Sequence, residues 1–280
     1  MHPLDGVLAK YDRAKEQFDE FLGEVDAWFN SDPEPHFSRG YFDTKNWEWV
    51  ERFQIREHPP ARLGVLLGDS IHNLRSALDH LIWQVTILDG ATPDDATQFP
   101  IASKSKSQFD RMADRRIPGL RAKHRALVKR VQPYHAGNRA HAHPLSVLAA
   151  LSNTDKHRIV NPTYSFIAGD SARELKRLVE GYRGSGHPPA VEFLLAKQGQ
   201  GLVHGTPWLR IKFPKTQEPP RSVDVGGELT LGVAIGEVGV SADDIPKVAD
   251  FVLAVISRFA QDFPEPWTRR REAATDADGH

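Results

Sequence analysis

The chain has 280 residues, of which 40% are hydrophobic and 26% are charged, and its formal net charge is −1. These fractions are typical of a globular protein, so they exclude wholesale disorder, and the length suffices for one large domain or two ordinary ones. The chain contains no cysteine, which excludes disulfides, thiolate zinc sites and thiol nucleophiles.

The N-terminal segment and the apolar runs bear on where the protein resides. The segment MHPLDGVLAKYDRAKEQFDEF has acidic residues from Asp5 onward and no continuous apolar stretch, so we expect no signal peptide. The longest apolar runs, such as residues 251–256, are far shorter than the roughly 18 residues needed to span a bilayer. We therefore expect a cytoplasmic protein that is not integral to a membrane.

The first part of the chain combines a helix with a β-hairpin. Apolar residues at three- and four-residue steps predict an amphipathic helix over residues 4–29. Alternating residues predict a hairpin over residues 36–56, with its turn at residues 43–46. The second strand shows Trp47, Trp49, Phe53 and Ile55 on one face, and Glu51 breaks that alternation, which predicts a bulge or a register change there.

Helical patterns continue to about residue 155. The most regular apolar pattern in the chain predicts a long helix over residues 62–88, which Asp89, Gly90 and Pro93 end. A short helix is predicted over residues 107–113, a basic helix over 120–131, an irregular histidine-rich segment over 132–143, and a further short helix over 144–152.

Alternating patterns dominate the second part. They predict strands over residues 159–168, 190–196, 207–213 and 222–235, with a helix over 172–182. A last helix is predicted to begin near Ser241, with a buried stripe of Ile245, Val248, Phe251, Val252, Val255 and Phe259. Gly- and Pro-rich turns between the last three strands favour an antiparallel sheet. We predict an α+β fold: a helical N-terminal layer (1–155) with an inserted β-hairpin (36–56), and a C-terminal antiparallel sheet (156–263) closed by the final helix. The tail, 264–280, is predicted to be disordered. Whether these parts form one domain or two stays open.

A polar cluster lies on the predicted helix 62–88. Its members are Asp69, His72, Arg75, Ser76, Asp79 and His80. At about 100° per residue, Arg75, Asp79 and His72 share the flank nearer the core, and the other three face away from it. Arg75 and Asp79 are four residues apart, so we expect them to pair on the helix surface.

Two interpretations of this cluster stay open. In the first, an Arg–Asp pair and a hydrogen-bonded histidine join the helix to neighbouring elements. In the second the cluster is a site, because histidine transfers protons near neutral pH and arginine stabilises charge on a phosphate.

Residues 75–80, Arg-Ser-Ala-Leu-Asp-His, form an R-x4-H pattern within a helix. The pattern resembles the signature of HEPN domains, helical bundles of which many members are metal-independent ribonucleases. The resemblance implies that Arg75 binds or stabilises phosphate and that His80 acts as general acid or base in the attack of a 2′-hydroxyl. Ser76 then occupies the polar position after the arginine.

A second resemblance covers more of the chain. Residues 72–80 (HNLRSALDH) and 151–158 (LSNTDKHR), with the intervening FPI at 99–101 and QPY at 132–134, are similar to segments of uncharacterised bacterial proteins. This resemblance supports the segmentation and implies no activity.

Four ionisable residues stand at the junction between the helix 144–152 and the first C-terminal strand. They are Asp155, Lys156, His157 and Arg158. One interpretation is a solvated connector with a local salt bridge. In the other, the junction lies against the long helix, Lys156 or Arg158 neutralises Asp69 or Asp79, and His157 is a second proton-transfer group.

Two further patterns concern ligands. Residues 104–130 hold ten Lys and Arg against two Asp, which indicates either a solvated helix face or a strip that binds a polyanion such as RNA. His135, His141 and His143 have no carboxylate among them, so we predict no metal site there. Nucleotide-binding and hydrolase motifs are absent from the sequence, and we predict no cofactor.

The sequence leaves two hypotheses. The first is a binding or interaction protein that uses the polar cluster on helix 62–88 together with Asp155, Lys156 and Arg158. The alternative is a HEPN-like, metal-independent ribonuclease with Arg75, His80 and His157 as catalytic candidates. Whether the protein is an enzyme, and whether it forms a homodimer, stays open.

Overall fold

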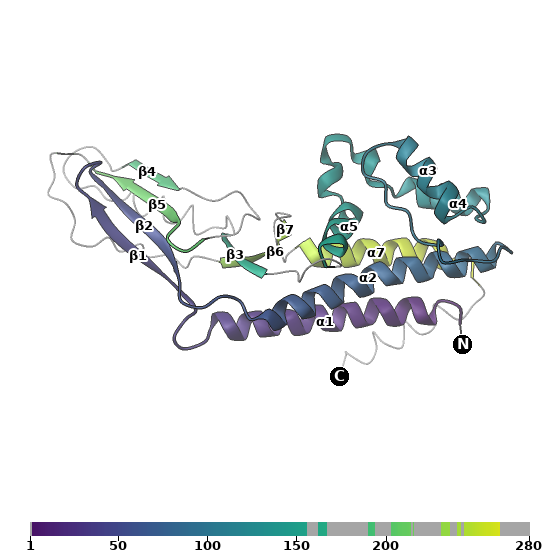
Figure 1. Ribbon diagram of the computed structural model, residues 1–280, viewed down its shortest axis with the longest axis horizontal. Helices are drawn as coiled ribbons and strands as arrows, with labels where there is room; N and C mark the ends of the chain where they lie inside the picture. Colours follow the sequence, from purple (N-terminus) through teal and green to yellow (C-terminus); the bar gives the residue numbers. More distant parts are fainter. Residues whose placement is uncertain are drawn as a thin grey trace. The chain divides into compact units, whose positions relative to one another are not determined.

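The computed structural model describes residues 2–155, 162–166, 190–193, 203–213, 215, 231–235, 240–241 and 244–263. It combines helices with antiparallel strands, so the predicted α+β class is confirmed (Figure 1). The chain divides into two compact units that interleave in the sequence. The helical unit comprises Met1–Phe21, Val65–Val160 and Asp243–His280, and the strand unit comprises Leu22–Gly64 and Asn161–Ala242. The structure therefore groups the segments differently from the expected division near residue 155.

The predicted helices are present with small changes at their ends. They are α1 (Asp5–Phe29), α2 (Ala61–Leu88), α3 (Lys106–Arg116), α4 (Ala122–Arg130), α5 (Pro144–Asp155) and α7 (Asp244–Ala260). The segment expected to be irregular forms the 3₁₀ helix η1 (Pro133–Ala142), which is broken at Gly137, where φ is 54°. Glycine adopts this angle because it has no Cβ. The helix predicted over residues 172–182 and the tail 264–280 lie outside the described residues.

The core of the helical unit is built around α2. The apolar stripe predicted for this helix is buried except at Leu88, and its members are Leu67, Ile71, Leu74, Leu78, Leu81, Ile82 and Val85. Polar bonds fix α1 against α2: the Ser70 hydroxyl donates to the Ala14 carbonyl (2.8 Å), and the Asn73 amide donates to the Gln17 side chain (2.8 Å). Two amphipathic helices are thus joined by apolar burial and by satisfied polar groups between them.

The final helix, α7, belongs to the helical unit and packs against α5 (Figure 1). Its predicted stripe is buried except at Phe251, which is half-buried; the buried members are Ile245, Val248, Val252, Val255 and Phe259. The expectation that this helix closes the sheet stays a prediction.

The described residues of the strand unit form two antiparallel sheets. The first has the order β1 (His36–Asp43), β2 (Glu48–Ile55), β5 (Pro207–Lys212) and β4 (Ala190–Phe193), and the second has β3 (Pro162–Phe166), β6 (Leu231–Ile235) and β7 (Val240–Ser241). The antiparallel arrangement was predicted. The hairpin is not an insertion confined to the helical layer, however, because β2 pairs directly with β5.

The hairpin turn differs from the expectation at one residue. The Asp43 carboxylate accepts hydrogen bonds from the backbone of Lys45 (2.9 Å) and Asn46 (3.3 Å), which forms an Asx-type turn. A further bond from the Asn46 side chain contributes most to lowering the pKa of Asp43. Trp47 has φ of 57°, in the left-handed region, so the prediction that it is a strand residue was wrong and β2 begins at Glu48. The register shift between Glu51 and Arg52 confirms the predicted irregularity.

A buried carboxylate joins three strands of the first sheet. Glu51 accepts hydrogen bonds from the Ser38 hydroxyl (2.5 Å) and the Trp49 indole (2.8 Å), and the Trp208 indole donates to Ser38 (3.0 Å). Gly40 stands opposite Glu51, and a Cβ at Gly40 would lie 2.3 Å from the Glu51 carboxylate and from the Trp49 ring. The network therefore requires glycine at this position of β1.

Candidate functional site

The predicted pair of Arg75 and Asp79 exists on α2 and has a further role. Arg75 Nε and Nη2 donate to the Asp79 carboxylate at 3.2 and 2.9 Å. Arg75 Nη2 also donates to the Phe99 carbonyl (2.7 Å), and the Phe99 N–H donates to Asp79 Oδ1 (2.8 Å). The two side chains are 13% and 26% exposed. The pair thus satisfies both backbone polar groups of Phe99 in a largely dehydrated place.

Gln132 completes the support of the same loop. Its Nε2 donates to the carbonyls of Pro100 (3.0 Å) and Val128 (2.9 Å), and its Oε1 accepts from the Ala102 N–H (2.8 Å). The FPI and QPY stretches therefore meet in space. We call Arg75, Asp79 and Gln132 the loop clamp, because together they replace the strand partner that residues 99–102 lack.

Arg116, at the end of α3, lies beside the loop clamp. Burial lowers the pKa of Arg116, the neighbouring Arg75 lowers it further, and Asp79 opposes both effects. Asp79 forms its ion pair with Arg75, so Arg116 receives only a longer-range influence from this carboxylate. This arrangement leaves excess positive charge at the edge of α3.

The remaining members of the polar cluster face away from the core. Asp69, His72 and His80 are exposed, and Ser76 is half-buried. His72 Nε2 lies 3.4 Å from the Ser76 hydroxyl, and His80 lies beside Gly6 of α1, 4.0 Å from where a Cβ would stand. His72 was expected to share with Arg75 and Asp79 the flank nearer the core, and this was wrong, because His72 is exposed whereas Arg75 and Asp79 are half-buried.

The remaining predicted site residues stand at the junction that follows α5. Asp155 ends α5. Lys156, His157 and Arg158 lie outside the described residues. The expectation that this junction lies near the long helix therefore stays a prediction.

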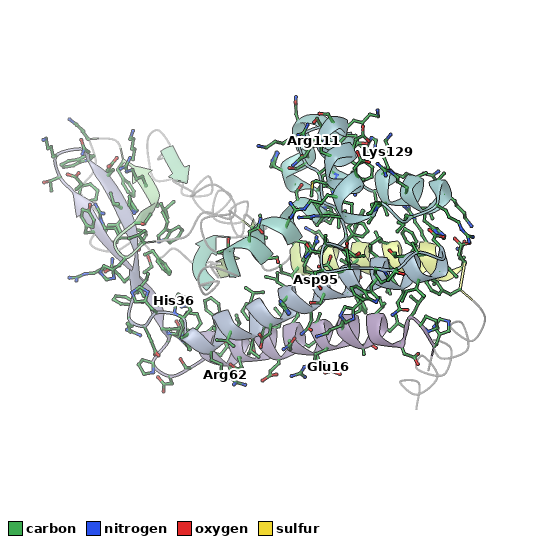
Figure 2. The ribbon with its side chains drawn as sticks, turned by 45° about the vertical axis from the view of Figure 1, so that its right-hand side comes forward. Glu16, His36, Arg62, Asp95, Arg111 and Lys129 are labelled. Atoms are coloured by element: carbon green, nitrogen blue, oxygen red, sulfur yellow. The ribbon has the colours of Figure 1, made fainter. Side chains whose placement is uncertain are left out.

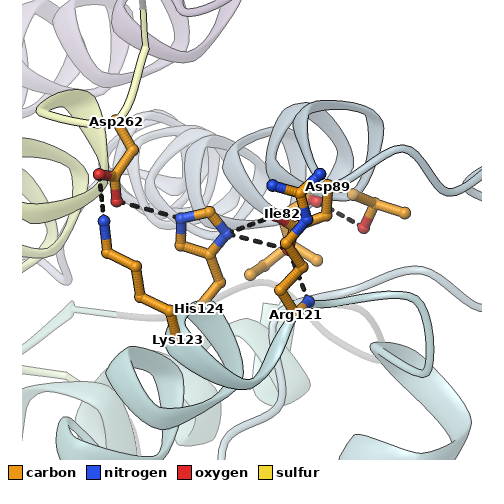
Figure 3. Close-up of polar contacts among 7 residues, drawn as sticks. Ile82, Asp89, Arg121, Lys123, His124 and Asp262 are labelled. Carbon is orange, nitrogen blue, oxygen red and sulfur yellow. Dashed lines mark hydrogen bonds and ion pairs between the residues drawn. The ribbon is translucent and has the colours of Figure 1, made fainter.

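Sequence reasoning missed a buried charge network around His124 (Figure 3). His124 Nδ1 lies 2.8 and 2.9 Å from the two oxygens of Asp89, and Nε2 lies 3.1 Å from Asp262. The Arg121 N–H donates to Asp89 (2.7 Å), and Lys123 pairs with Asp262. The side chain of Asp89 is fully buried and that of His124 is 6% exposed.

The network has a definite electrostatic character. Both ring nitrogens of His124 face carboxylate oxygens, and only the imidazolium form can donate to both. Hydrogen bonds from Lys123 and His124 outweigh burial and lower the pKa of Asp262. The network ties α4 to Asp89, directly after α2, and to Asp262, two residues after the end of α7. Its one sequence signal was that His124 and Val128 share the apolar side of the basic helix, whereas its two aspartates are distant in sequence.

The three histidines near η1 have local roles. His135 Nε2 bonds the Lys129 carbonyl (3.0 Å), and His141 Nδ1 bonds the Asn138 carbonyl (3.0 Å). His143 Nδ1 accepts from the Leu145 N–H (3.2 Å) at the start of α5, and burial lowers its pKa, with His135 adding to the effect. Within the part of the chain that the structure describes, no three His, Asp or Glu side chains gather in a way that suits a metal ion.

The basic run divides into paired and unpaired cations. Lys106 pairs with Asp110, Arg121 with Asp89, Lys123 with Asp262, and Arg125 with Asp114. The other cations have no carboxylate in ion-pairing contact among the described residues, and we call them the basic surface: Lys104, Arg111, Arg115, Arg116, Lys129 and Arg130. Figure 2 shows Arg111 on α3 and Lys129 on α4.

No protein-family model, no curated protein and no solved structure matches this chain. A search of the described helices finds none with the length and apolar character that crossing a bilayer requires. The candidate site therefore rests on its own geometry.

Proposed function

We propose that this protein is a binding protein whose basic surface on α3 and α4 takes the phosphate backbone of single-stranded RNA. The observation that carries the proposal is the set of six cations that lack a carboxylate partner among the described residues. Four of the six are arginines, whose planar guanidinium binds phosphate through two parallel hydrogen bonds.

Five of the six cations lie on α3 and α4, and Lys104 lies two residues before α3. The ion pair between Arg125 and Asp114 joins α4 to α3. On α3, Arg111 and Arg115 lie opposite the buried Phe109 and Ala113, and both are exposed. An unpaired cation releases counterions from the nucleic acid when it binds a phosphate, which is the main source of affinity that does not depend on sequence.

An aromatic pair adjoins the basic surface. The rings of Tyr134 and His135 have centroids 4.1 Å apart, and His135 bonds the carbonyl of Lys129. His135 is exposed. Cations that follow the backbone, together with an exposed ring on which a base can stack, are typical of surfaces that bind single strands.

The ribonuclease alternative receives less support from the geometry. It requires Arg75 to bind or stabilise a phosphate, but its Nε and Nη2 bond Asp79 and the Phe99 carbonyl. His80 is exposed and free of such a constraint on its position. The alternative stays a prediction, and the binding experiment includes a direct test of it.

The test is the salt dependence of binding, measured by fluorescence anisotropy with a labelled single-stranded RNA in EDTA. Single strands contribute a slope of about −0.7 per neutralised phosphate, so six contacts predict a slope near −4 and a roughly 300-fold loss of affinity between 50 and 200 mM salt. In the double variant Arg111→Gln/Lys129→Gln the slope should fall to about −3, and the same change of salt should cost only about 50-fold.

The matched control is Arg13→Gln, which removes an exposed arginine that pairs with Glu16 on α1. It should leave affinity and slope unchanged. Absence of binding at low salt, or an equal loss in the control and in the double variant, would contradict the proposal. Cleavage of the RNA that disappears in His80→Ala would favour the ribonuclease instead.

A further inference from the structure

One face of the hairpin that β1 and β2 form (Figure 1) carries arginines and aromatic rings. Residues two apart in a strand share a face, so Phe37, Arg39 and Tyr41 of β1 point to the same side. Arg52 of β2 stands directly opposite Arg39, and Arg56, just after β2, reaches the Phe37 ring. We call these five residues the hairpin face. All of them belong to the strand unit.

The guanidinium group of Arg52 is fixed by neutral groups. Its Nε and Nη2 donate to the Tyr41 hydroxyl at 3.3 and 3.0 Å, and its Nη1 donates to the Gly205 carbonyl at 2.7 Å. The Arg52 Cζ lies 5.5 Å from the centroid of the Tyr41 ring. These bonds hold the cation in place but do not neutralise it, because a hydroxyl and a carbonyl carry no net charge.

Arg56 is held in a similar way at the other end of the hairpin face. Its Cζ lies 4.5 Å from the centroid of the Phe37 ring, which is a cation–π contact, and its Nη1 donates to the backbone carbonyl of Glu34 at 3.1 Å. Two arginines are thus positioned beside aromatic rings before any ligand arrives. Such preorganisation reduces the entropy that ordering these side chains would cost on binding.

The positive charge of the hairpin face is not balanced. Like charges directly opposite each other on two strands destabilise the pair, and Arg39 and Arg52 occupy such positions. Among the described residues no carboxylate forms an ion pair with Arg39, Arg52 or Arg56, whereas Arg210 of the same sheet lies 3.6 Å from Glu48. Arg39 is exposed and has no hydrogen-bond partner in the described part of the chain. A ligand that brings negative charge would therefore relieve the repulsion between the two facing cations.

The hairpin face also offers a hydroxyl donor and an exposed ring. The Tyr41 hydroxyl accepts two bonds from Arg52, and its own proton has no acceptor among the described residues. Tyr41 is 40% exposed. Phosphate oxygens accept from guanidinium and hydroxyl donors, and unpaired bases stack on aromatic rings and on guanidinium planes. The donors and the ring together match a strand that carries both phosphates and unpaired bases.

We propose that the hairpin face is a second surface for single-stranded RNA. Arg39 and Arg52 bind phosphate oxygens, and a base stacks on the exposed ring of Tyr41. Charge complementarity together with the ring selects this ligand, because an acidic peptide supplies carboxylates but no base. The inference rests on the proposed function for RNA as the ligand, and it adds a surface in the strand unit to the one on α3 and α4. For a strand that reaches both surfaces, three arginine contacts add about −2 to the slope of about −4 that the basic surface gives.

The first test separates stacking from charge. Tyr41→Leu removes the ring and should weaken the binding of labelled single-stranded RNA at least about fivefold, the lower end of what one stacked base contributes. Tyr41→Phe, the matched control, keeps the ring and should lose much less. Labelled polyglutamate has charge but no bases, so Tyr41→Leu should change its affinity little. Equal losses for polyglutamate and for RNA would identify an acidic peptide as the occupant and would overturn the proposal.

The second test concerns the phosphate contacts. Arg39→Gln should make the salt slope for RNA about 0.7 less steep, because one phosphate loses its cation. Lys45→Gln is the control, because Lys45 is an exposed cation in the turn of the same hairpin and lies outside the hairpin face. It should keep the slope of the wild type. Thermal unfolding should be unchanged in Arg39→Gln, so that its loss of binding reports on the ligand and not on the fold.

The results for the hairpin face and for the basic surface are distinguishable. If Arg111→Gln/Lys129→Gln weakens RNA binding while Tyr41→Leu and Arg39→Gln keep wild-type affinity and slope, the basic surface stands and the hairpin face is refuted. If the two hairpin variants weaken binding and the helical double variant does not, the hairpin face stands and the function proposed for α3 and α4 fails.

Discussion

Replacing Asp79 with alanine removes the carboxylate that holds both Arg75 and the Phe99 amide. The Arg75 side chain is only 13% exposed, so its charge would be left largely dehydrated and without its carboxylate. Removing one partner of a buried ion pair costs about 3–5 kcal/mol, and leaving a buried N–H without an acceptor costs about 1–3 kcal/mol. Because Asp79 is 26% exposed, solvent screens part of the pair, and we expect a loss of about 3 kcal/mol.

The measurement is urea unfolding of Asp79→Ala, together with hydrogen exchange of the Phe99 amide. Asp79→Asn is the matched control, because its Oδ1 can still accept from Phe99 and its loss should be smaller. In the double variant Arg75→Met/Asp79→Leu no charge is left unpaired. Its loss of unfolding free energy should therefore be smaller than the sum of the losses in Arg75→Met and Asp79→Leu, by a coupling energy of about 2 kcal/mol. A loss below about 1 kcal/mol with an unchanged Phe99 exchange rate would refute the role assigned to the loop clamp.

Three further predictions concern other parts of the structure. Gln132→Ala should cost about 3 kcal/mol in the same unfolding assay, because three buried backbone groups lose their partner. The hydrogen bond from Lys123 helps to hold the folded-state pKa of Asp262 below the ordinary value of an aspartate. The stabilisation is therefore complete above about pH 5 and is lost as the pH falls through that lowered pKa. The difference in unfolding free energy between wild type and Asp262→Asn should therefore become smaller as the pH falls, as measured by urea unfolding at a series of pH values. A difference that becomes larger in acid would contradict this prediction. Gly40→Ala should destabilise the strand unit by more than about 2 kcal/mol, because the new Cβ would lie 2.3 Å from neighbouring side chains, whereas Gly23→Ala, with nothing within 4 Å, should be neutral or stabilising in thermal melts.

Local patterns predicted most of the elements. The stripe on α2 and the stripe on α7 were predicted because a helix that packs on a core must place apolar residues every three or four positions. The alternation in the hairpin predicted β1 and β2, and the interruption at Glu51 marked the true register shift. Trp47 was misplaced because its left-handed backbone depends on the turn that Asp43 stabilises.

For the candidate site, the sequence predicted only contacts between residues of one helix. The pairing of Arg75 with Asp79 followed from their spacing of four residues, but the Phe99 backbone that both bind is 20 residues or more away. His124 looked like one more member of a basic run, because nothing local connects it to Asp89 or Asp262. The sequence also could not show which Lys and Arg residues of 104–130 form ion pairs, since two of the four carboxylate partners lie outside this segment.

The sequence by itself determined the α+β class, the bounds of the long helices, the Arg75–Asp79 pair and the absence of thiol chemistry. Each of these depends on residues within one or two turns of each other, or on composition alone. Only the tertiary structure decided that the hairpin shares a sheet with β5, that Arg75 and Gln132 support one loop, and which cations remain unpaired. Those features depend on contacts between distant segments, and such contacts form when buried polar groups must find partners wherever the fold places them.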